Sequence, residues 1–324
     1  YMSDREEKTG KNDNGKKNKG GKRNKIVAIE MIILILLIMA AAVIFIQKDK
    51  SVKEAARIHD QKTKKTEQTT PATQKDNEIE EETEGTDEET GDRDEAVPDR
   101  SNFAVQPGVS VGTTEQSDEK IVYLTLDDGP SDNTQAVLDI LDKYNVKATF
   151  FVTGEMPEYK DMIKAAYDKG HTIGMHTYSH DYAKVYASVD AYFQDLDQIG
   201  QMVQEEIGYV PCFIRFPGGS SNTVSKKYTA GIMSTLVQEV QNRGYQYYDW
   251  NGSSGDGSVR TTEELVAQAT SFDSNNIILL CHDSHGKQTT VEALPQIIEH
   301  YQSLGYTFKA LDRDSFVAHH GVNN

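Results

Sequence analysis

The sequence predicts an α/β domain built on parallel strands, which occupies about the last two thirds of the chain. From about residue 120 onward, short runs rich in β-branched and aromatic residues alternate with longer amphipathic stretches, a pattern typical of strands joined by helices. Acidic, basic and histidine residues repeatedly follow these runs directly. Because parallel strands end at one edge of a sheet, the second observation also predicts one shared site there.

Seven runs have the length and composition of strands. They are 121–128, 148–154, 171–176, 212–217, 245–250, 276–283 and 306–311. Helical periodicity covers 134–144, 159–169, 188–207, 225–243, 262–271 and 291–303. Seven strands in this alternation indicate a (β/α) barrel of seven or eight strands, and an open doubly wound sheet is the alternative.

A basic tail and an apolar segment come first in the chain. Residues 1–25 are rich in lysine and glycine and lack apolar periodicity, which predicts a disordered tail. Residues 26–46 are long enough to cross a bilayer and contain one charge, Glu30. The alternatives are a buried core helix and a signal peptide cleaved after the alanines at 40–42, but the apolar region is longer than in signal peptides. We therefore expect an uncleaved transmembrane helix.

Charge sets the expected orientation of this helix. Lysines and arginines crowd its N-terminal flank between 16 and 25, so the positive-inside rule predicts a cytoplasmic N-terminus and an extracellular remainder. Residues 47–118 include a long acidic run, which predicts a disordered extracytoplasmic linker before a folded domain at 119–324. The acidic run in this linker contributes to the net charge of −17, so that total says little about the ligand of the folded domain.

The only two cysteines are Cys212 and Cys281. A disulfide between them is one alternative in an extracellular domain. Each cysteine lies within a different apolar run, however, and we therefore expect two free, buried thiols.

Asp127 and Asp128 end the first strand and are followed by Gly129 and Pro130. Adjacent carboxylates repel each other unless a metal ion, a shared proton or solvent offsets the repulsion. A solvated turn after the strand is the alternative reading of this stretch alone.

His176 and His180 are four residues apart after the third strand, close enough to bind one metal ion if the segment coils. Two surface histidines are the alternative. Together with Asp127 and Asp128 they form a candidate site of two histidines and one carboxylate, with open positions for water and substrate. The second carboxylate is then free to take a proton.

Three more strand ends have residues suited to catalysis. Arg215 precedes a Phe-Pro-Gly-Gly turn in which an exposed backbone N–H could face an oxyanion, although an ordinary turn is equally compatible. Asp249 and Trp250, the only tryptophan, could hold Arg215 and line a sugar site, or be a solvated acid beside a core aromatic. His282 ends a buried run, where it could be a core histidine or a general acid.

The five segments, in this order, resemble the NodB-homology polysaccharide deacetylases, carbohydrate esterase family 4. The resemblance rests on five motifs and covers residues 120–312, about three fifths of the chain. The motifs are TLDDG (Thr125 to Gly129), HTYSH (His176 to His180), RFPGG (Arg215 to Gly219), DW (Asp249, Trp250) and LCH (Leu280 to His282). The resemblance implies a distorted (β/α) barrel.

The resemblance also implies a role for each site residue. Asp127 would be the general base, and Asp128, His176 and His180 would bind a divalent metal, zinc before cobalt, manganese or nickel. The other implied roles fall to Arg215 (positioning Asp127), Asp249 (pairing with Arg215), His282 (protonating the leaving amine), Gly218 (oxyanion donor) and Trp250 (sugar wall).

The sequence departs from the family pattern in three places. Leu126 stands where the family often has phenylalanine, and Gln246 stands where the fourth motif often has its first aspartate. Residues 218–221 form a bare Gly-Gly-Ser-Ser loop, so an aromatic side chain often found at that wall is missing.

We therefore expect a membrane-anchored, metal-dependent hydrolase that removes N-acetyl groups from cell-wall glycan, most specifically from N-acetylglucosamine of peptidoglycan. The alternatives are a deacetylase of a chitin oligomer, of a secreted N-acetylhexosamine polymer or of acetylated xylan, and a silent glycan-binding domain. The expected partners are the glycan and the membrane but not nucleic acid, and the catalytic domain is expected to be monomeric.

Overall fold

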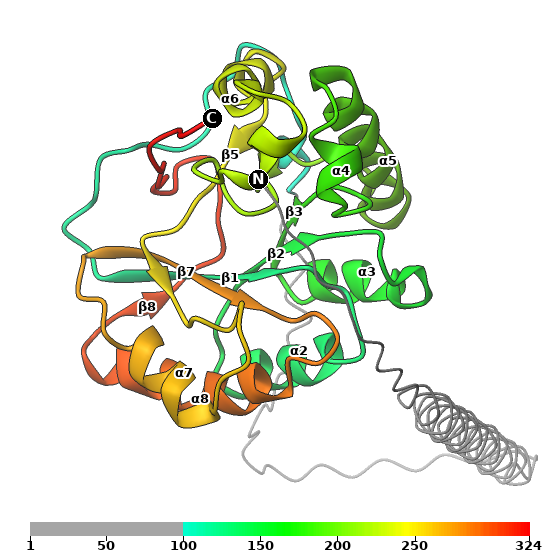
Figure 1. The fold of residues 1–324 in the computed structure, drawn as a ribbon. Coiled ribbons are helices and arrows are strands. Elements are labelled where there is room, and N and C mark those ends of the chain that lie inside the picture. The colour runs from blue at the N-terminus through cyan, green and yellow to red at the C-terminus, as the bar shows by residue number, and fades with distance from the viewer. Residues whose placement is uncertain (1–99) are drawn as a thin grey trace, which may run out of the picture. The chain divides into compact units, whose positions relative to one another are not determined.

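A computed structural model describes residues 100–324 of the chain. Eight strands form one sheet in this part (Figure 1). They are β1 (Ile121–Asp127), β2 (Thr149–Val152), β3 (Thr172–Met175), β4 (Phe213–Ile214), β5 (Gln246–Tyr247), β6 (Gly252–Ser253), β7 (Asn276–His282) and β8 (Thr307–Phe308). All of the pairings between these strands are parallel. The prediction of an α/β fold with parallel strands is therefore confirmed.

The sheet curls but does not close. Its order is β5-β4-β3-β2-β1-β7-β6, with β8 paired to β1, so β5 and β6 are left as its two edges. Strand β1 lies at the centre: it pairs with β7 along its whole length, while its other edge is shared by β8 and β2. The observed sheet is thus a curled, incomplete barrel, and β6, which no strand pattern predicted, forms one of its edges.

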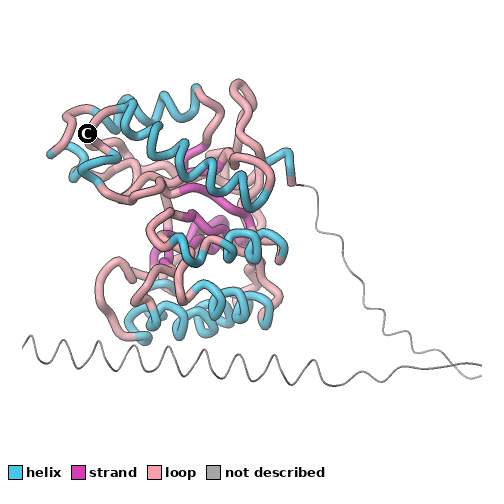
Figure 2. The backbone as a smooth tube through the Cα atoms, turned by 90° about the vertical axis from the view of Figure 1, so that its right-hand side faces the viewer, coloured by secondary structure: helices cyan, strands magenta, loops and turns pink. Residues whose placement is uncertain are grey.

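Helices cover the outer side of this curled sheet, as Figures 1 and 2 show. They are α2 (Thr134–Lys143), α3 (Asp161–Asp168), α4 (Tyr182–Val185), α5 (Val189–Ile207), α6 (Ile232–Asn242), α7 (Thr262–Ala269) and α8 (Gln288–Ser303), with short 3-10 helices at Ser101–Phe103, Pro157–Tyr159 and Val224–Lys227. Local capping explains several boundaries. The Ser188 hydroxyl accepts from the Ala191 N–H at the start of α5, and Thr261 and Glu264 form a capping box at the start of α7.

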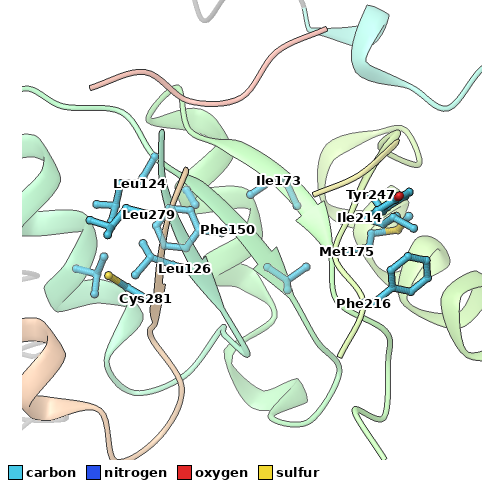
Figure 3. Close-up of a cluster of buried hydrophobic side chains, with 14 of the residues drawn as sticks. Leu124, Leu126, Phe150, Ile173, Met175, Ile214, Phe216, Tyr247, Leu279 and Cys281 are labelled. Atoms are coloured by element: carbon cyan, nitrogen blue, oxygen red, sulfur yellow. The ribbon is translucent and has the colours of Figure 1, made fainter. Parts of the chain in front are cut away.

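The hydrophobic core lies between the sheet and the helices. All seven residues of β1 are buried, because the sheet is covered on both faces. Leu124 and Leu126 of β1 pack in the same cluster as Phe150 and Leu279 of the neighbouring strands (Figure 3). A second cluster on the inner face contains Tyr123, Phe151 and Tyr248. Cys212 and Cys281 are both free and buried, as expected.

Residues 100–118, which the sequence analysis assigned to the linker, pack on the domain instead. Arg100 is buried and donates to the His171 and Tyr167 carbonyl oxygens. The Gly112 N–H donates to the Arg313 carbonyl at 2.6 Å. The predicted domain start at 119 therefore lies too far along the chain, and 91–324 forms one compact unit.

The predicted tail (1–25), transmembrane helix (26–46) and most of the predicted linker (47–99) lie outside the described residues. Within residues 100–324, none of the helices combines the length and apolar character needed to span a membrane.

Candidate active site

Most of the residues predicted to carry chemistry line one cavity of about 140 Å³, whereas Arg215 and Asp249 are buried outside its lining. Asp127 ends β1, His176 follows β3 and His282 ends β7. Because these strands run in one direction, their carboxyl ends meet at the same edge of the sheet. The cavity is lined by Asp127, Asp128, His176, His180, Tyr182, Phe216, Gly218, Trp250, Leu280 and His282.

Asp128, His176 and His180 form a group that can hold one metal ion. One ligand atom from each lies within 4.8 Å of the other two, and Asp128 Oδ1 is 3.4 Å from Nε2 of both histidines. This buried oxygen has no hydrogen-bond partner within residues 100–324. One carboxylate and two imidazoles beside a cavity fit a divalent cation such as zinc.

The backbone around these ligands is held in an unusual conformation. Asp128 has φ 68° and His180 has φ 48°, in the left-handed region that residues other than glycine rarely adopt. The N–H groups of Tyr178 and Ser179, between the two histidines, both donate to the Asp195 carboxylate. Helix α5 therefore supports, through Asp195, the turn that aims His180 at the cavity.

Hydrogen bonding determines which nitrogen of His176 is available to a metal. Nδ1 lies 2.7 Å from the Arg215 carbonyl oxygen, and because a carbonyl only accepts, Nδ1 carries the hydrogen. Burial lowers the pKa of His176, which favours the neutral form that binds metals. Burial opposes ionisation of Asp128, but electrostatic interaction with the imidazoles of His176, His180 and His282 outweighs it and holds the pKa of Asp128 below its usual value.

Asp127 is buried beside these ligands and is held by Arg215. The Arg215 Nη1 donates to Asp127 Oδ1 at 2.7 Å and to the Thr125 hydroxyl at 2.8 Å. Arg215 is itself fully buried, and its Nε donates to the Tyr248 carbonyl at 2.9 Å. Asp127 Oδ2 lies 3.7 Å from His176 Nε2. The arginine thus fixes one oxygen and leaves the other available to accept a proton.

His282 has a carboxylate partner, Asp256, that the sequence analysis missed. Asp256 Oδ1 lies 2.7 Å from His282 Nδ1, and Oδ2 accepts from the His282 N–H at 2.8 Å. Burial lowers the pKa of His282, but the hydrogen bond and charge of Asp256 outweigh it and raise that pKa to about 9. His282 can therefore act as an acid near neutral pH. The one signal in the sequence that could have indicated Asp256 was its position as the only acid in a Gly-Ser-rich stretch shortly after a predicted strand.

The structure corrects the expected pairing of Asp249 with Arg215. Arg215 Nη2 reaches only the backbone carbonyl of Asp249, at 3.2 Å. The fully buried Asp249 carboxylate instead accepts from the Ser220 N–H at 2.8 Å, the Ser220 hydroxyl at 2.5 Å and the His320 N–H at 2.8 Å. These donors surround the carboxylate, so it needs no arginine. Asp249 thus fastens the C-terminal segment to the loop that contains Gly218.

Gly218 and Trp250 both line the cavity. Gly218 adopts φ 75°, and its N–H has no acceptor among the described residues. That N–H is therefore available to a ligand. Trp250 is half-buried, and the His320 ring meets it edge-on at 4.8 Å.

A larger hollow, of about 390 Å³, lies between residues 108–112 and residues 241–246. Tyr245 is its only titratable lining residue. The smaller cavity, with its carboxylates and imidazoles, is therefore the candidate active site.

Comparison with known proteins identifies the family. Residues 114–237 match the family model described as polysaccharide deacetylase. YheN, a Bacillus subtilis protein assigned to the polysaccharide deacetylases, is 30% identical over 217 residues, which cover 64% of this chain and 72% of the relative. A peptidoglycan-N-acetylglucosamine deacetylase of Bacillus cereus is 29% identical over 226 residues, which cover 65% of this chain and 78% of the relative.

A solved structure extends the similarity to the fold. The catalytic domain of peptidoglycan N-acetylglucosamine deacetylase from Eubacterium rectale has 46% sequence identity and a TM-score of 0.63, and the match covers 67% of this chain and 98% of that one. The chain therefore belongs to the polysaccharide deacetylases, carbohydrate esterase family 4, which are hydrolases that act on N-acetyl amide bonds.

Proposed function

We propose that this protein is a zinc-dependent deacetylase that removes the N-acetyl group from N-acetylglucosamine of peptidoglycan, on the outer side of a bacterial membrane. One observation carries the chemistry: a carboxylate, Asp127, and an imidazole, His282, lie 3.7 Å and 3.9 Å from atoms of a three-residue metal-binding group. Amide hydrolysis requires a base, an acid and stabilisation of an oxyanion, and this cavity has candidates for all three.

The family is metal-dependent, and the donor set fits a divalent cation. Asp128, His176 and His180 would hold it. A cation bound there would polarise the acetyl carbonyl and lower the pKa of a nearby water molecule. Asp128 Oδ1, which lacks a protein partner among residues 100–324, would then be satisfied by coordination.

The remaining residues move protons and orient the substrate. Asp127 accepts a proton from the water molecule that attacks the acetyl carbon, while Arg215 keeps its carboxylate in place. The Gly218 N–H donates to the developing oxyanion. As the carbon–nitrogen bond breaks, His282 gives its proton to the departing amine, and Asp256 stabilises the charged imidazole beforehand. The products are acetate and a glucosamine-type amine.

Two relatives support peptidoglycan as the substrate, since the proteins of Bacillus cereus and Eubacterium rectale described above are both named as peptidoglycan N-acetylglucosamine deacetylases. The proposed anchor supports the same conclusion. A protein held in the membrane by residues 26–46, with an acidic spacer after it, is suited to an immobile polymer close to the membrane. The proposed topology places the N-terminus in the cytoplasm and the single catalytic domain, as a monomer, outside.

The test uses residues 91–324, the compact unit of the chain. Acetate release is measured from purified peptidoglycan and from a chitin oligomer, after chelation and again after zinc is restored. We expect release from peptidoglycan that requires zinc and is lost in Asp127→Asn. Release from the oligomer alone would refute the substrate, and release that persists after chelation would refute the metal requirement. For the topology, protease added to intact cells should remove the domain, and full protection would refute its placement outside the membrane.

A further inference from the structure

The side chain of Tyr182 lines the active-site cavity but has no part in the chemistry described so far. It follows His180 by two residues and begins helix α4. Its ring meets the His180 ring edge-on, with centroids 5.9 Å apart, and packs against Tyr186 at 5.5 Å. Tyr186 is in turn fixed, because its hydroxyl donates to the Pro217 carbonyl at 2.7 Å. Packing on both sides therefore holds the Tyr182 ring in place.

The Tyr182 hydroxyl lies against the backbone of Gly218. A Cβ atom at position 218 would be 2.5 Å from this hydroxyl and 3.2 Å from Asn222 Cβ. The hydroxyl thus occupies the space that a side chain at 218 would need. Glycine is required at 218 for this reason as well as for its φ of 75°.

Two unpaired hydrogen-bond donors consequently lie side by side on one wall of the cavity. Among residues 100–324, neither the Tyr182 hydroxyl nor the Gly218 N–H has a protein partner, whereas the neighbouring Tyr186 hydroxyl and Asn222 amide each donate to a backbone carbonyl. A tyrosine hydroxyl held by packing and left without a partner beside a binding cavity is available to a ligand. Both donors border the same space as the metal-binding residues.

We infer that Tyr182 is a substrate-contacting residue, and that its hydroxyl donates a hydrogen bond to the acetyl oxygen beside the N–H of Gly218. This inference rests on the proposed function and adds a second protein donor to its oxyanion site. Negative charge grows on that oxygen during attack by water, so both hydrogen bonds strengthen toward the transition state. Tyr182 therefore provides, from the start of helix α4, a polar side chain beside the Gly218-Gly219 loop, which has none of its own.

The test is Tyr182→Phe in the 91–324 fragment, which removes the hydroxyl and keeps the ring. The matched control is Tyr228→Phe, which changes a tyrosine that is 44% exposed and absent from the cavity lining. We expect kcat for acetate release from peptidoglycan to fall about 10- to 100-fold, with KM within about 3-fold of the parent, because one oxyanion donor among several is lost. Zinc affinity, measured by calorimetric titration, should not change.

Three results would overturn the inference. The first is an unchanged kcat. The second is a change confined to KM, which would indicate that Tyr182 contacts the sugar. The third is a loss of activity accompanied by weaker zinc binding, which would show that Tyr182 acts by supporting His180. Each of these leaves the proposed function standing, because the parent fragment remains active. A parent that releases no acetate from any glycan would instead refute the proposed function, and this inference with it.

Discussion

Asp283, directly after His282, is a fully buried carboxyl whose ionisation should make the folding stability depend on pH. Its Oδ2 accepts from the Thr134 hydroxyl at 2.6 Å, whereas Oδ1 has no partner within residues 100–324. Burial, with a smaller contribution from the charges of Asp128 and Asp127, raises the pKa of Asp283 from 3.8 to about 7. The folded protein therefore keeps this group neutral at pH values where the unfolded chain has it ionised.

The size of the effect follows from proton linkage. Because the native pKa is raised, the stabilisation is complete below the unfolded pKa of 3.8 and is lost as the pH rises through about 7. Each unit of pKa difference corresponds to about 1.4 kcal/mol. Between pH 5 and pH 8 the group should lower the free energy of unfolding by roughly 2–3 kcal/mol. Asp283→Asn is neutral in both states and should lose this dependence.

The assay is urea denaturation of the 91–324 fragment with chelator present, at several values of pH from 5 to 8. An amide that lacks a partner can lower stability at every pH, so the readout is the difference between variant and parent as a function of pH. We expect this difference to shift in favour of Asp283→Asn by roughly 2–3 kcal/mol from pH 5 to pH 8. Asp314→Asn, on the exposed surface, is the control and should show a constant difference. A constant difference for Asp283→Asn would refute a neutral buried carboxyl.

Three further substitutions test the site. Asp256→Asn should lower kcat at pH 7 by about 100-fold or more, because an amide cannot stabilise the charged His282, and a parent-like kcat would contradict this role. Asp128→Ala should abolish tight zinc binding in calorimetric titration without changing the circular dichroism, and unchanged affinity would exclude it as a ligand. Gly218→Ala should destabilise the fold by about 1–3 kcal/mol. Adding Tyr182→Phe should recover part of this loss, because it removes the hydroxyl that clashes with the new Cβ and leaves the ring atom Cζ at 3.4 Å from it. Strictly additive denaturation energies would contradict that contact.

The sequence predicted the strands of the sheet better than its closure. Long runs of buried residues such as β1 and β7 reveal themselves by composition, because both faces of a covered sheet are apolar. Strand β6 has two residues, Gly252 and Ser253, and neither favours a strand by itself. Whether a curled sheet closes depends on pairing between distant edge strands, for which local periodicity has no signal.

The same edge strand explains why Asp256 was missed. Strand β6 pairs with β7 in parallel, with Gly252 opposite Leu279 and Ser253 opposite Leu280. This register brings Asp256, three residues farther along, to the end of β7, where His282 lies. By contrast, the three proposed metal ligands lie within or next to two predicted strand ends, so sequence spacing was enough to group them.

Each proton-transfer group has a charged partner from a strand other than its own. Asp127, at the end of β1, is held by Arg215 from the end of β4, and His282, at the end of β7, is held by Asp256 after β6. The partners have opposite charge: the Arg215 guanidinium donates to the Asp127 carboxylate, and the Asp256 carboxylate favours a cation at the imidazole of His282. The two pairs share no partner atom, so the surroundings of the base and those of the acid can be changed independently of each other. We therefore expect Asp256→Asn to impair proton donation without weakening the contact between Arg215 and Asp127.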